Sequence, residues 1–387
     1  MFDILTLNKI AQCGLDQLSD KKYVVTDDAA KDVDGIILRS FSMHDMELPK
    51  SLKAIARAGA GTNNIPIEKC SEQGIVVFNT PGANANAVKE LVIASLLLSS
   101  RKISDGIAWA NTLTGDDIAK QVEKGKSNFA GQEIQGKTLG VIGLGAIGIK
   151  VANTAQHLGM KVIGYDPYLS VDAAWRLSNH IEKANNINDV YEKADYITVH
   201  VPLTPETKGS INSDTFAIMK DGVRILNFSR GELVNNDDMK KAIANGKVAC
   251  YVCDFPNADI INQPNIIAIP HLGASTRESE DNCAIMAAQE IADYLENGNI
   301  LNSVNFPNCS LPMGTADRVT ILHKNVPNMI TQFTKAFAEA GVNISDMINK
   351  SKKDYAYTII NADDVATNEV IDKIKAIDGV LKVRVIK

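Results

Sequence analysis

Three polar residues stand beyond consecutive apolar runs in the second half of the chain, and their types suit acid–base chemistry. Arg230 and His271 each follow such a run directly, and Asp259 lies a few residues beyond another. Open α/β sheets bind ligands at the carboxyl ends of their strands, so we expect these side chains to meet. An arginine can hold a carboxylate, a histidine can move a hydroxyl proton, and a carboxylate can orient the histidine ring. Spacing alone leaves scattered surface charges as the alternative.

A second candidate site is a glycine-rich turn. Gly143, Gly145 and Gly148 stand in G-x-G-x-x-G spacing between an apolar run and a helical pattern. Such glycines allow a tight turn, close approach of a pyrophosphate and close helix–strand packing. Asp166 ends the next apolar run, near the spacing of about 20 residues expected for a residue that binds the ribose hydroxyls. Its charge would repel a 2′-phosphate, so the predicted cofactor is NAD; a purely structural turn is the alternative.

The elements that must position these residues are short β-branched runs that alternate with longer helical patterns. Near-continuous apolar strands joined by helices indicate parallel sheets covered on both faces. The predicted fold class is therefore α/β, with a Rossmann-like NAD domain inserted in a flavodoxin-like substrate domain, both doubly wound. The predicted strands are 35–40, 54–59, 74–79, 138–145, 161–167, 196–202, 223–229, 248–254 and 265–270.

Changes of pattern along the chain predict the domain boundaries. Residues 1–100 and 278–305 are expected to form a discontinuous substrate domain. A long helical pattern begins at residue 278, and its position suggests that the chain returns there to the first unit. Residues 101–277 are the expected NAD domain. The segment 306–317 contains two prolines and is expected to be a linker. Residues 318–387 are expected to form a ferredoxin-like βαββαβ module.

Composition narrows the class of protein. A length of 387 residues predicts two or three domains, and 45% hydrophobic with 22% charged residues is typical of soluble globular proteins. The net charge of −6 argues against a nucleic-acid partner, and no apolar run approaches the roughly 18 residues that a membrane span needs. The N-terminus lacks the basic region of a signal peptide, and six cysteines are too few for a disulfide framework, so we expect a cytoplasmic location.

Cys250 and Cys253 form a C-x-x-C pair inside an apolar strand pattern. A metal site would need further Cys or His ligands at suitable spacing, and a redox pair would normally open a helix. We therefore interpret both as small core residues and expect no metal.

Four stretches of the chain resemble the D-isomer-specific 2-hydroxyacid dehydrogenase family, and the resemblance covers nearly the whole chain. They are NFSRGELV (227–234), IPHLGAST (269–276), RAGAGTNNIPI (57–67) and NTPGANANAVKELVIASLL (79–97). The last two are similar to the branch that oxidises 3-phospho-D-glycerate to 3-phosphohydroxypyruvate with NAD, the first step of L-serine biosynthesis.

The resemblance assigns roles residue by residue. It implies that Arg230 and His271 are catalytic and that Asp259 takes the place of the usual glutamate, with a shorter side chain. It also implies that Asp254 accepts a hydrogen bond from the nicotinamide carboxamide. The remaining implied cofactor residues are Gly143, Gly145, Ala146, Ile147, Gly148, Asp166, Val201, Phe228, Ser229, Leu272, Gly273 and Ala274, with Arg230 and His271 at the nicotinamide end. The implied substrate residues are Arg39, Arg57, Ala60, Gly61 and Asn84.

The C-terminal module resembles the ACT domain, a small-ligand regulatory fold. The segments 321–329 and 340–347 match its effector-contact segments, which places His323, Asn325 and Asn343 at an amino-acid effector site. Asn328 stands where the family often has glycine, and a side chain there could block or alter the pocket. ACT modules commonly pair edge to edge, so we expect a homodimer or homotetramer.

Two other functions stay open at this point. The enzyme could act on another 2-hydroxy acid, such as 2-hydroxyglutarate or glycerate, or the protein could be a non-catalytic NAD-sensing binding protein. Arg39 and Arg57 follow or interrupt apolar strands, where cations are costly without an anionic partner. This pair favours a doubly anionic substrate.

Overall fold

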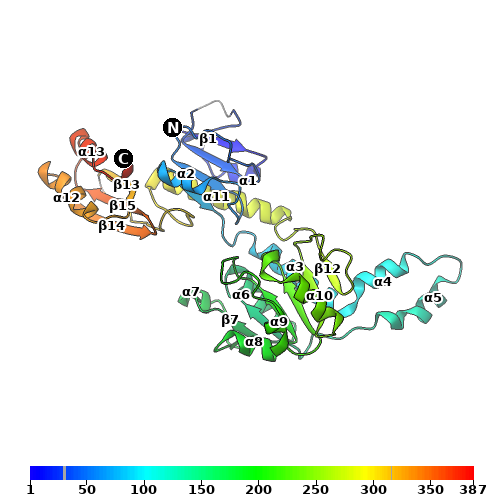
Figure 1. Ribbon diagram of the computed structural model, residues 1–387. Coiled ribbons are helices and arrows are strands. Elements are labelled where there is room, and N and C mark those ends of the chain that lie inside the picture. The colour runs from blue at the N-terminus through cyan, green and yellow to red at the C-terminus, as the bar shows by residue number, and fades with distance from the viewer. Residues whose placement is uncertain (29–31, 315) are drawn as a thin grey trace. The chain divides into compact units, whose positions relative to one another are not determined.

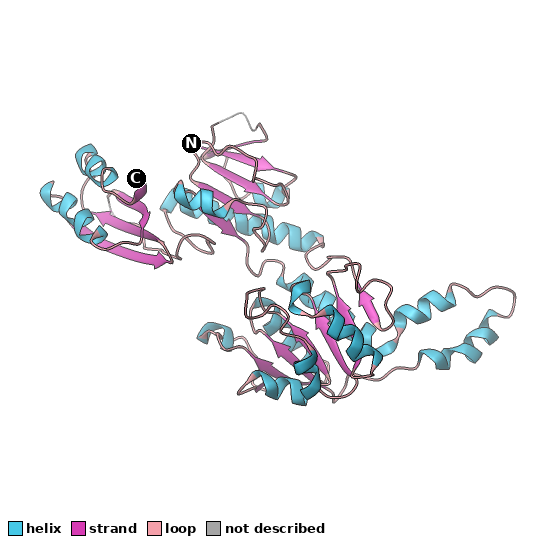
Figure 2. Ribbon diagram, in the orientation of Figure 1, coloured by secondary structure: helices cyan, strands magenta, loops and turns pink. Residues whose placement is uncertain are grey.

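The computed structural model describes residues 1–28, 32–314 and 316–387. The chain divides into two compact units, Met1–Asn84 with Glu280–Lys387 and Ala85–Ser279. Each unit combines helices with β-sheet (Figures 1 and 2). Among the described residues, none of the helices combines the length and the apolar character that spanning a bilayer requires.

The N-terminal part of the first unit is a five-stranded parallel sheet. Its elements are β1 (Phe2–Leu7), α1 (Gln12–Leu15), β2 (Tyr23–Thr26), β3 (Gly35–Leu38), β4 (Ala54–Arg57), α2 (Ile67–Glu72) and β5 (Val76–Asn79), joined by α11 (Arg277–Asn297) from later in the chain. The strand order is β2-β1-β3-β4-β5. One apolar cluster on this sheet includes Leu5, Ile36 and Val77, and another includes Ile4, Ile37 and Phe78. Both faces are therefore covered, as the near-continuous apolar strands predict.

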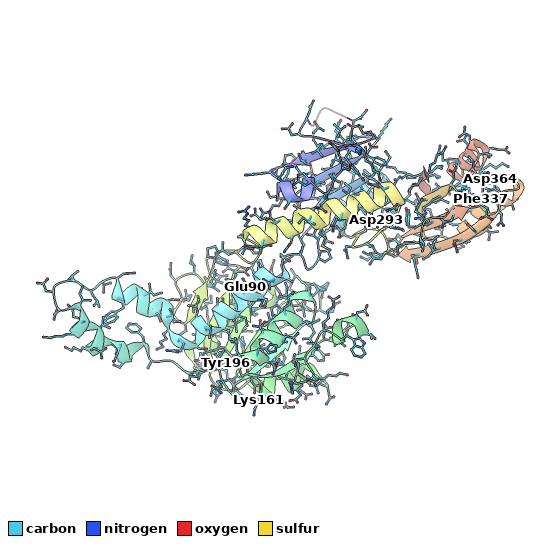
Figure 3. The ribbon with its side chains drawn as sticks, turned by 180° about the vertical axis from the view of Figure 1, so that it is seen from behind. Glu90, Lys161, Tyr196, Asp293, Phe337 and Asp364 are labelled. Atoms are coloured by element: carbon cyan, nitrogen blue, oxygen red, sulfur yellow. The ribbon has the colours of Figure 1, made fainter. Side chains whose placement is uncertain are left out.

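The C-terminal part of the same unit has the predicted βαββαβ order. Its elements are β13 (Arg318–Lys324), α12 (Met329–Glu339), β14 (Ile344–Lys352), β15 (Tyr355–Ala362), α13 (Asn368–Lys375) and β16 (Val380–Ile386). The sheet is antiparallel, in the order β14-β15-β13-β16. Ile321 and Ile360 pack with Phe333 and Phe337 of α12 in one cluster, which fills the side of the sheet next to the helices (Figure 3).

The other face of this antiparallel sheet shares a core with the N-terminal part of the unit. Leu322, Tyr357 and Ile359 of the module belong to one buried cluster with Phe78 of β5 and Tyr294 of α11. A sheet buries its apolar faces against other elements, so this packing covers the face that α12 and α13 leave open.

Cations of the module reach the carboxyl end of α11. Arg384 donates hydrogen bonds of 3.0 and 2.7 Å to the carbonyl oxygens of Tyr294 and Leu295, and the fully buried Arg318 donates one of 2.7 Å to that of Asn297. The last carbonyls of a helix lack partners within the helix and carry partial negative charge. The two arginines therefore attach the module by satisfying the end of α11.

The second unit contains a seven-stranded parallel sheet in the order β12-β11-β10-β9-β6-β7-β8. Its strands are β6 (Thr138–Ile142), β7 (Lys161–Tyr165), β8 (Glu182–Lys183), β9 (Tyr196–Val199), β10 (Val223–Asn227), β11 (Val248–Cys253) and β12 (Ile266–Ala268). Its helices include α3 (Ala85–Arg101), α6 (Ala146–His157), α7 (Val171–Ala174), α8 (Ile187–Lys193), α9 (Ser213–Ile218) and α10 (Asn236–Ala244). The chain starts in the middle of the sheet at β6 and winds first to one side and then to the other. This doubly wound order confirms the predicted α/β class and places a topological switch point between β6 and β9.

Two helices of the second unit form a projecting arm. In α4 (Ile103–Ala110) and α5 (Ile118–Gly125) no residue is buried, and Ile107 is 57% exposed. The rings of Trp109 and Phe129 lie 5.2 Å apart between their centroids, which joins the two sides of the arm. Figure 1 shows the arm extending away from the sheet of this unit.

The units differ from the predicted domains in two ways. The sequence pattern predicts helix α3 in the substrate domain with residues 1–100, but α3 lies in the second unit, where Val88 and Leu96 join the apolar cluster of the sheet. The hydroxyl of Tyr196 lies 2.8 Å from that of Ser100 in α3 (Figure 3), and this hydrogen bond links α3 to β9. The predicted separate module 318–387 belongs to the same unit as the N-terminal part, because the two share a core. The predicted linker 306–317 includes residue 315, which lies outside the described residues.

Leu322→Ala tests whether the module and the N-terminal part of the first unit unfold together. Removing this side chain, which is 1% exposed, should cost about 2–5 kcal/mol through lost contacts and a cavity. Because the cavity opens in the shared core, amide hydrogen exchange should accelerate in β5 as well as in β13. The matched control is Met347→Ala, whose side chain is 38% exposed, and which should change little. Faster exchange in β13 with no change in β5 would show that the two parts are independent.

Glu290 of α11 predicts a pH-dependent stability of the first unit. Burial raises the pKa of its carboxyl from 4.5 to about 8, and its Oε1 accepts a 2.7 Å hydrogen bond from Asn302. The unfolded chain releases this proton from about pH 4.5, while the folded chain keeps it, so stability should fall as the pH rises toward 8. Relative to Glu290→Gln, the wild type should lose up to about 1.4 kcal/mol per pH unit in this window. Hydrogen exchange of α11 measures this, with the exposed Glu72→Gln as control; parallel pH curves for wild type and Glu290→Gln would refute it.

Candidate active site

The glycine turn joins β6 to α6. Gly143 has φ +90°, and a Cβ there would lie 2.6 Å from the carbonyl oxygen of His200, so only glycine fits. At Gly148, a Cβ would lie 2.0 Å from the carbonyl oxygen of Gly143. These two glycines are therefore required by the fold itself.

Gly145 has a different role. Its φ is −77°, and a Cβ there would meet no atom within 4 Å. The fold does not need glycine here, and the open space lies at the N-terminus of α6, where Ala146 and Ile147 begin the helix. A helix N-terminus with open backbone suits a pyrophosphate, so this turn fits the predicted dinucleotide.

Asp166 follows β7 and lies against the same turn. Its Oδ2 accepts a 2.8 Å hydrogen bond from the backbone N–H of Leu144, and its Oδ1 accepts one of 2.8 Å from that of Tyr168. These bonds fix the carboxylate beside the turn, and each oxygen keeps a second lone pair for a ribose hydroxyl.

Arg230 follows β10, and a buried asparagine fixes its backbone. Asn227 donates a 2.8 Å hydrogen bond from Nδ2 to the carbonyl oxygen of Arg230 and accepts one of 3.2 Å from the N–H of Ser229. The Ser229 hydroxyl donates to the carbonyl oxygen of Val199 in β9 at 2.8 Å. The side chain of Arg230 is exposed. Its Nη1 donates a 2.6 Å hydrogen bond to the carbonyl oxygen of Ser229, and a guanidinium has further N–H donors for an anion.

His271 follows β12 and lies beside the residues that follow β11. Its ring centroid is 4.7 Å from that of Phe255, and the imidazole is exposed. Asp254, which directly precedes Phe255, is 1% exposed, and burial raises the pKa of its carboxyl to about 6, while the charges of His271 and Arg230 act in the opposite direction. The structure therefore brings Arg230, Asp254 and His271 together.

Asp259, the predicted partner of His271, lies in the loop that follows β11. It lies in an exposed turn, where its N–H donates a 3.0 Å hydrogen bond to Oδ1 of Asn257. Its charge contributes to the raised pKa of Lys240 in α10, behind the hydrogen bond that Lys240 donates to Asp237.

The remaining predicted cofactor residues lie around the same edge of the sheet. Val201 follows β9, and its side chain is 3.0 Å from the position of a Cβ on Gly143. Phe228 is buried at the end of β10. Leu272 is 47% exposed, and Gly273 and Ala274 complete the loop after His271.

The predicted substrate residues lie in the first unit at the ends of β3 and β4. Arg39 forms a 2.7 Å ion pair with Glu280, and Arg57 donates a 3.1 Å hydrogen bond from Nε to Oδ1 of Asn64. Burial lowers the pKa of Arg57, and the charge of Arg39 lowers it further. Two cations that repel each other in this way favour an anionic ligand.

The other predicted substrate residues lie in the segments that follow β4 and β5. The carbonyl oxygen of Ala60 accepts a 2.6 Å hydrogen bond from Nδ2 of Asn79, and Gly61 follows in the same loop. Asn84 is the last residue of the first segment of this unit.

The predicted effector residues lie in the module but are already hydrogen-bonded. His323 is 2% exposed; its Nδ1 lies 2.8 Å from the carbonyl oxygen of Lys324 and its Nε2 lies 3.0 Å from the Thr358 hydroxyl. Asn325 and Asn343 donate to the carbonyl oxygen of Lys353 and to Asp363. Asn328 has φ 68°, so it adopts the left-handed conformation that a glycine would provide.

Three residues that support the site were not predicted. Asn227 and Asn64 hold Arg230 and Arg57, and Phe255 contacts the ring of His271. Asn227 had a usable signal, because an amide at the end of an apolar strand needs hydrogen-bond partners. The contact of Phe255 depends on tertiary structure.

Comparisons with known proteins show which proteins this chain resembles. Residues 93–273 match the family described as D-isomer specific 2-hydroxyacid dehydrogenase, NAD binding domain. The chain is 32% identical over 350 residues to the D-3-phosphoglycerate dehydrogenase of Escherichia coli strain K12, which covers 87% of this chain and 82% of that protein. It is 31% identical over 378 residues to that of Haemophilus influenzae, covering 93% and 88%. The NAD-bound 3-phosphoglycerate dehydrogenase of Entamoeba histolytica aligns with a TM-score of 0.60 and 27% identity, covering 79% of this chain and 98% of that one.

Gly145→Ala separates the fold of the turn from its binding role. The added methyl group meets no protein atom, so the melting temperature should stay the same. It occupies the space that a pyrophosphate needs, so the Kd for NAD, measured by calorimetry, should rise by about tenfold or more. Gly106→Ala in the arm is the matched control and should leave the Kd unchanged. An unchanged Kd in Gly145→Ala would remove this turn from the cofactor site.

Proposed function

Because the chain belongs to the D-isomer-specific 2-hydroxyacid dehydrogenase family, we propose that it oxidises 3-phospho-D-glycerate to 3-phosphohydroxypyruvate with NAD, the first step of L-serine biosynthesis. The observation that carries the proposal is the similarity to D-3-phosphoglycerate dehydrogenases over most of both chains. The glycine turn and the polar residues at the strand ends supply the groups that this reaction needs.

Each polar group has one task in the proposed reaction. When bound, NAD accepts a hydride from C2 of the substrate. The guanidinium of Arg230 holds the carboxylate of the substrate with paired donors. The imidazole of His271 accepts the proton of the C2 hydroxyl and returns it to solvent afterwards. Asn227 keeps Arg230 in place through its carbonyl oxygen.

The charge of the first unit supports a phosphorylated substrate. Arg39 and Arg57 lie close enough for one to lower the pKa of the other. A substrate with both a carboxylate and a phosphate would relieve this repulsion, whereas glycerate offers one anion only. We propose Arg39, Arg57, Asn84 and the backbone of Ala60 and Gly61 as the substrate-binding set.

We also propose a homo-oligomer, an effector site and a cytoplasmic location. Ile103, Ile107 and Ile118 of the arm are 42–57% exposed, which favours contact with a second copy. Asn328 takes up the left-handed conformation, so the loop can approach a small amino acid beside Asn325 and Asn343 as glycine would allow. The six free cysteines suit a reducing compartment.

Steady-state kinetics with NAD and three acids tests the function. We expect kcat/KM for 3-phosphoglycerate to exceed that for D-glycerate and for 2-hydroxyglutarate by about 100-fold or more, because the paired arginines would be left without a phosphate. His271→Ala is the control for the chemical step and should lower kcat by about 100-fold or more, with the Kd for NAD retained.

Preference for 2-hydroxyglutarate or glycerate would show that the substrate assignment is wrong. Binding of NAD without turnover of any of the three acids would instead favour a non-catalytic NAD sensor.

A further inference from the structure

A cavity of about 480 Å³ lies in the first unit, where the antiparallel module meets the N-terminal part. Three segments form its walls: the end of β5, the loop that follows α11 and the end of β14. None of the described residues that line it belongs to the predicted catalytic, cofactor, substrate or effector sets. We call it the lysine cavity, and its lining residues include Asn79, Asn302, Ser303, Asn308, Lys350 and Lys352.

The lysine cavity is positively charged. Lys350 and Lys352 stand two apart in β14, so their side chains lie on the same face of the strand, and no acid is among the described lining residues. In the described part of the chain, neither ammonium forms an ion pair with a carboxylate. Burial lowers the pKa of Lys352, and the charge of Lys353 lowers it further. An anion would stabilise cations that are crowded and partly removed from water.

The walls of the lysine cavity carry unused hydrogen-bond donors. The ammonium of Lys352 donates a 2.9 Å bond to the carbonyl oxygen of Ser303 and keeps further N–H groups, and Lys350 is exposed. Asn308 accepts a 2.9 Å bond at Oδ1 from the N–H of Asn302, which leaves its amide N–H groups for a ligand. A ligand rich in acceptor oxygens, as carboxylates and phosphates are, fits these donors.

The loop that follows α11 is held in place without a ligand. Asn302 has φ 58°, the left-handed conformation that asparagine adopts more readily than most residues. Its Nδ2 donates a 2.7 Å hydrogen bond to Oε1 of Glu290, which is 8% exposed. Ser303 forms an antiparallel bridge with Phe78 of β5. Because this wall is already ordered, binding a ligand there costs little conformational entropy.

Asn79 connects the lysine cavity with the proposed substrate residues. Its N–H donates a 3.4 Å hydrogen bond to the carbonyl oxygen of Asn302, and its Nδ2 donates one of 2.6 Å to that of Ala60. In the sheet, Asn79 pairs with Arg57 of β4. A ligand that attracts the amide of Asn79 would therefore act on the loop of Ala60.

We propose that the lysine cavity binds a small organic anion with two or more carboxylate or phosphate groups, and that its binding weakens the binding of substrate. The donors come from both β14 and the loop after α11, so two acidic groups on one ligand engage both segments. The bound anion lowers the positive potential of the unit and competes with Ala60 for the amide of Asn79. The effect on substrate rests on the proposed function, whereas the binding site does not.

Calorimetry on the full-length protein, without substrate, tests the site with citrate and with inorganic phosphate. Citrate should bind the wild type, and its Kd should rise by about tenfold or more in Lys350→Gln/Lys352→Gln, which removes both charges. Lys335→Gln, at a 72% exposed lysine of the same module, and Arg39→Gln, in the proposed substrate set, are the controls and should keep the wild-type Kd. Tighter binding of citrate than of phosphate would identify a carboxylate ligand, and the reverse a phosphorylated one.

Two results of calorimetry would overturn the inference. One is no binding of either probe to the wild type. The other is loss of citrate binding in Arg39→Gln but not in Lys350→Gln/Lys352→Gln, which would place the anion at the substrate arginines. If thermal melting shows that the double variant does not fold, Lys350→Gln alone decides, because this exposed position should raise the Kd by about threefold.

Steady-state kinetics tests the effect on substrate. Citrate should raise the KM for 3-phosphoglycerate by about twofold or more in the wild type, with kcat unchanged, and this rise should disappear in Lys350→Gln/Lys352→Gln. An equal rise in both proteins would show that citrate competes at the substrate arginines, which would overturn the coupling. Absence of turnover in the wild type would overturn the proposed function, while calorimetry would still decide whether the lysine cavity binds anions.

Discussion

Burial of parallel strands on both faces is the constraint on which the rest of this molecule depends. A strand covered on both sides has no place for an unpaired polar side chain, so the polar residues are placed where strands end. Arg57, Asp166, Arg230, Asp254 and His271 all stand at or just beyond the end of a strand. Because the strands within each sheet are parallel, their ends lie at one edge of that sheet, and residues far apart in sequence become neighbours. Arg57 belongs to the five-stranded sheet and the other four residues to the seven-stranded sheet.

The antiparallel sheet of the module in the first unit must also bury its apolar faces, but it does so in a different way. Its antiparallel sheet has one face under α12 and α13, and the other face is apolar through Leu322, Tyr357 and Ile359. Such a face must be covered, and the N-terminal part of the unit covers it. Arg318 and Arg384 then donate hydrogen bonds to the last carbonyl oxygens of α11, a helix that packs with the N-terminal part of the unit. The module therefore belongs to the same unit as Arg39 and Arg57, and a change in the packing of the module would affect the core that the two parts share.

The sequence predicted the features that are encoded locally. Apolar runs, and the segments that separate them, predicted the strands of the second sheet from β6 to β12 except the two-residue β8. The glycine spacing predicted the turn at Gly143. The sequence pattern placed α3 in the other unit, because the apolar residues of this helix suit either unit until the surroundings of Val88 and Leu96 are known. Spacing also predicted Asp259 as the partner of His271, but it did not predict that Asp254 is buried and Asp259 exposed, because this depends on the course of the chain after β11. Local pattern determines elements, and tertiary register decides which of two nearby acids is buried.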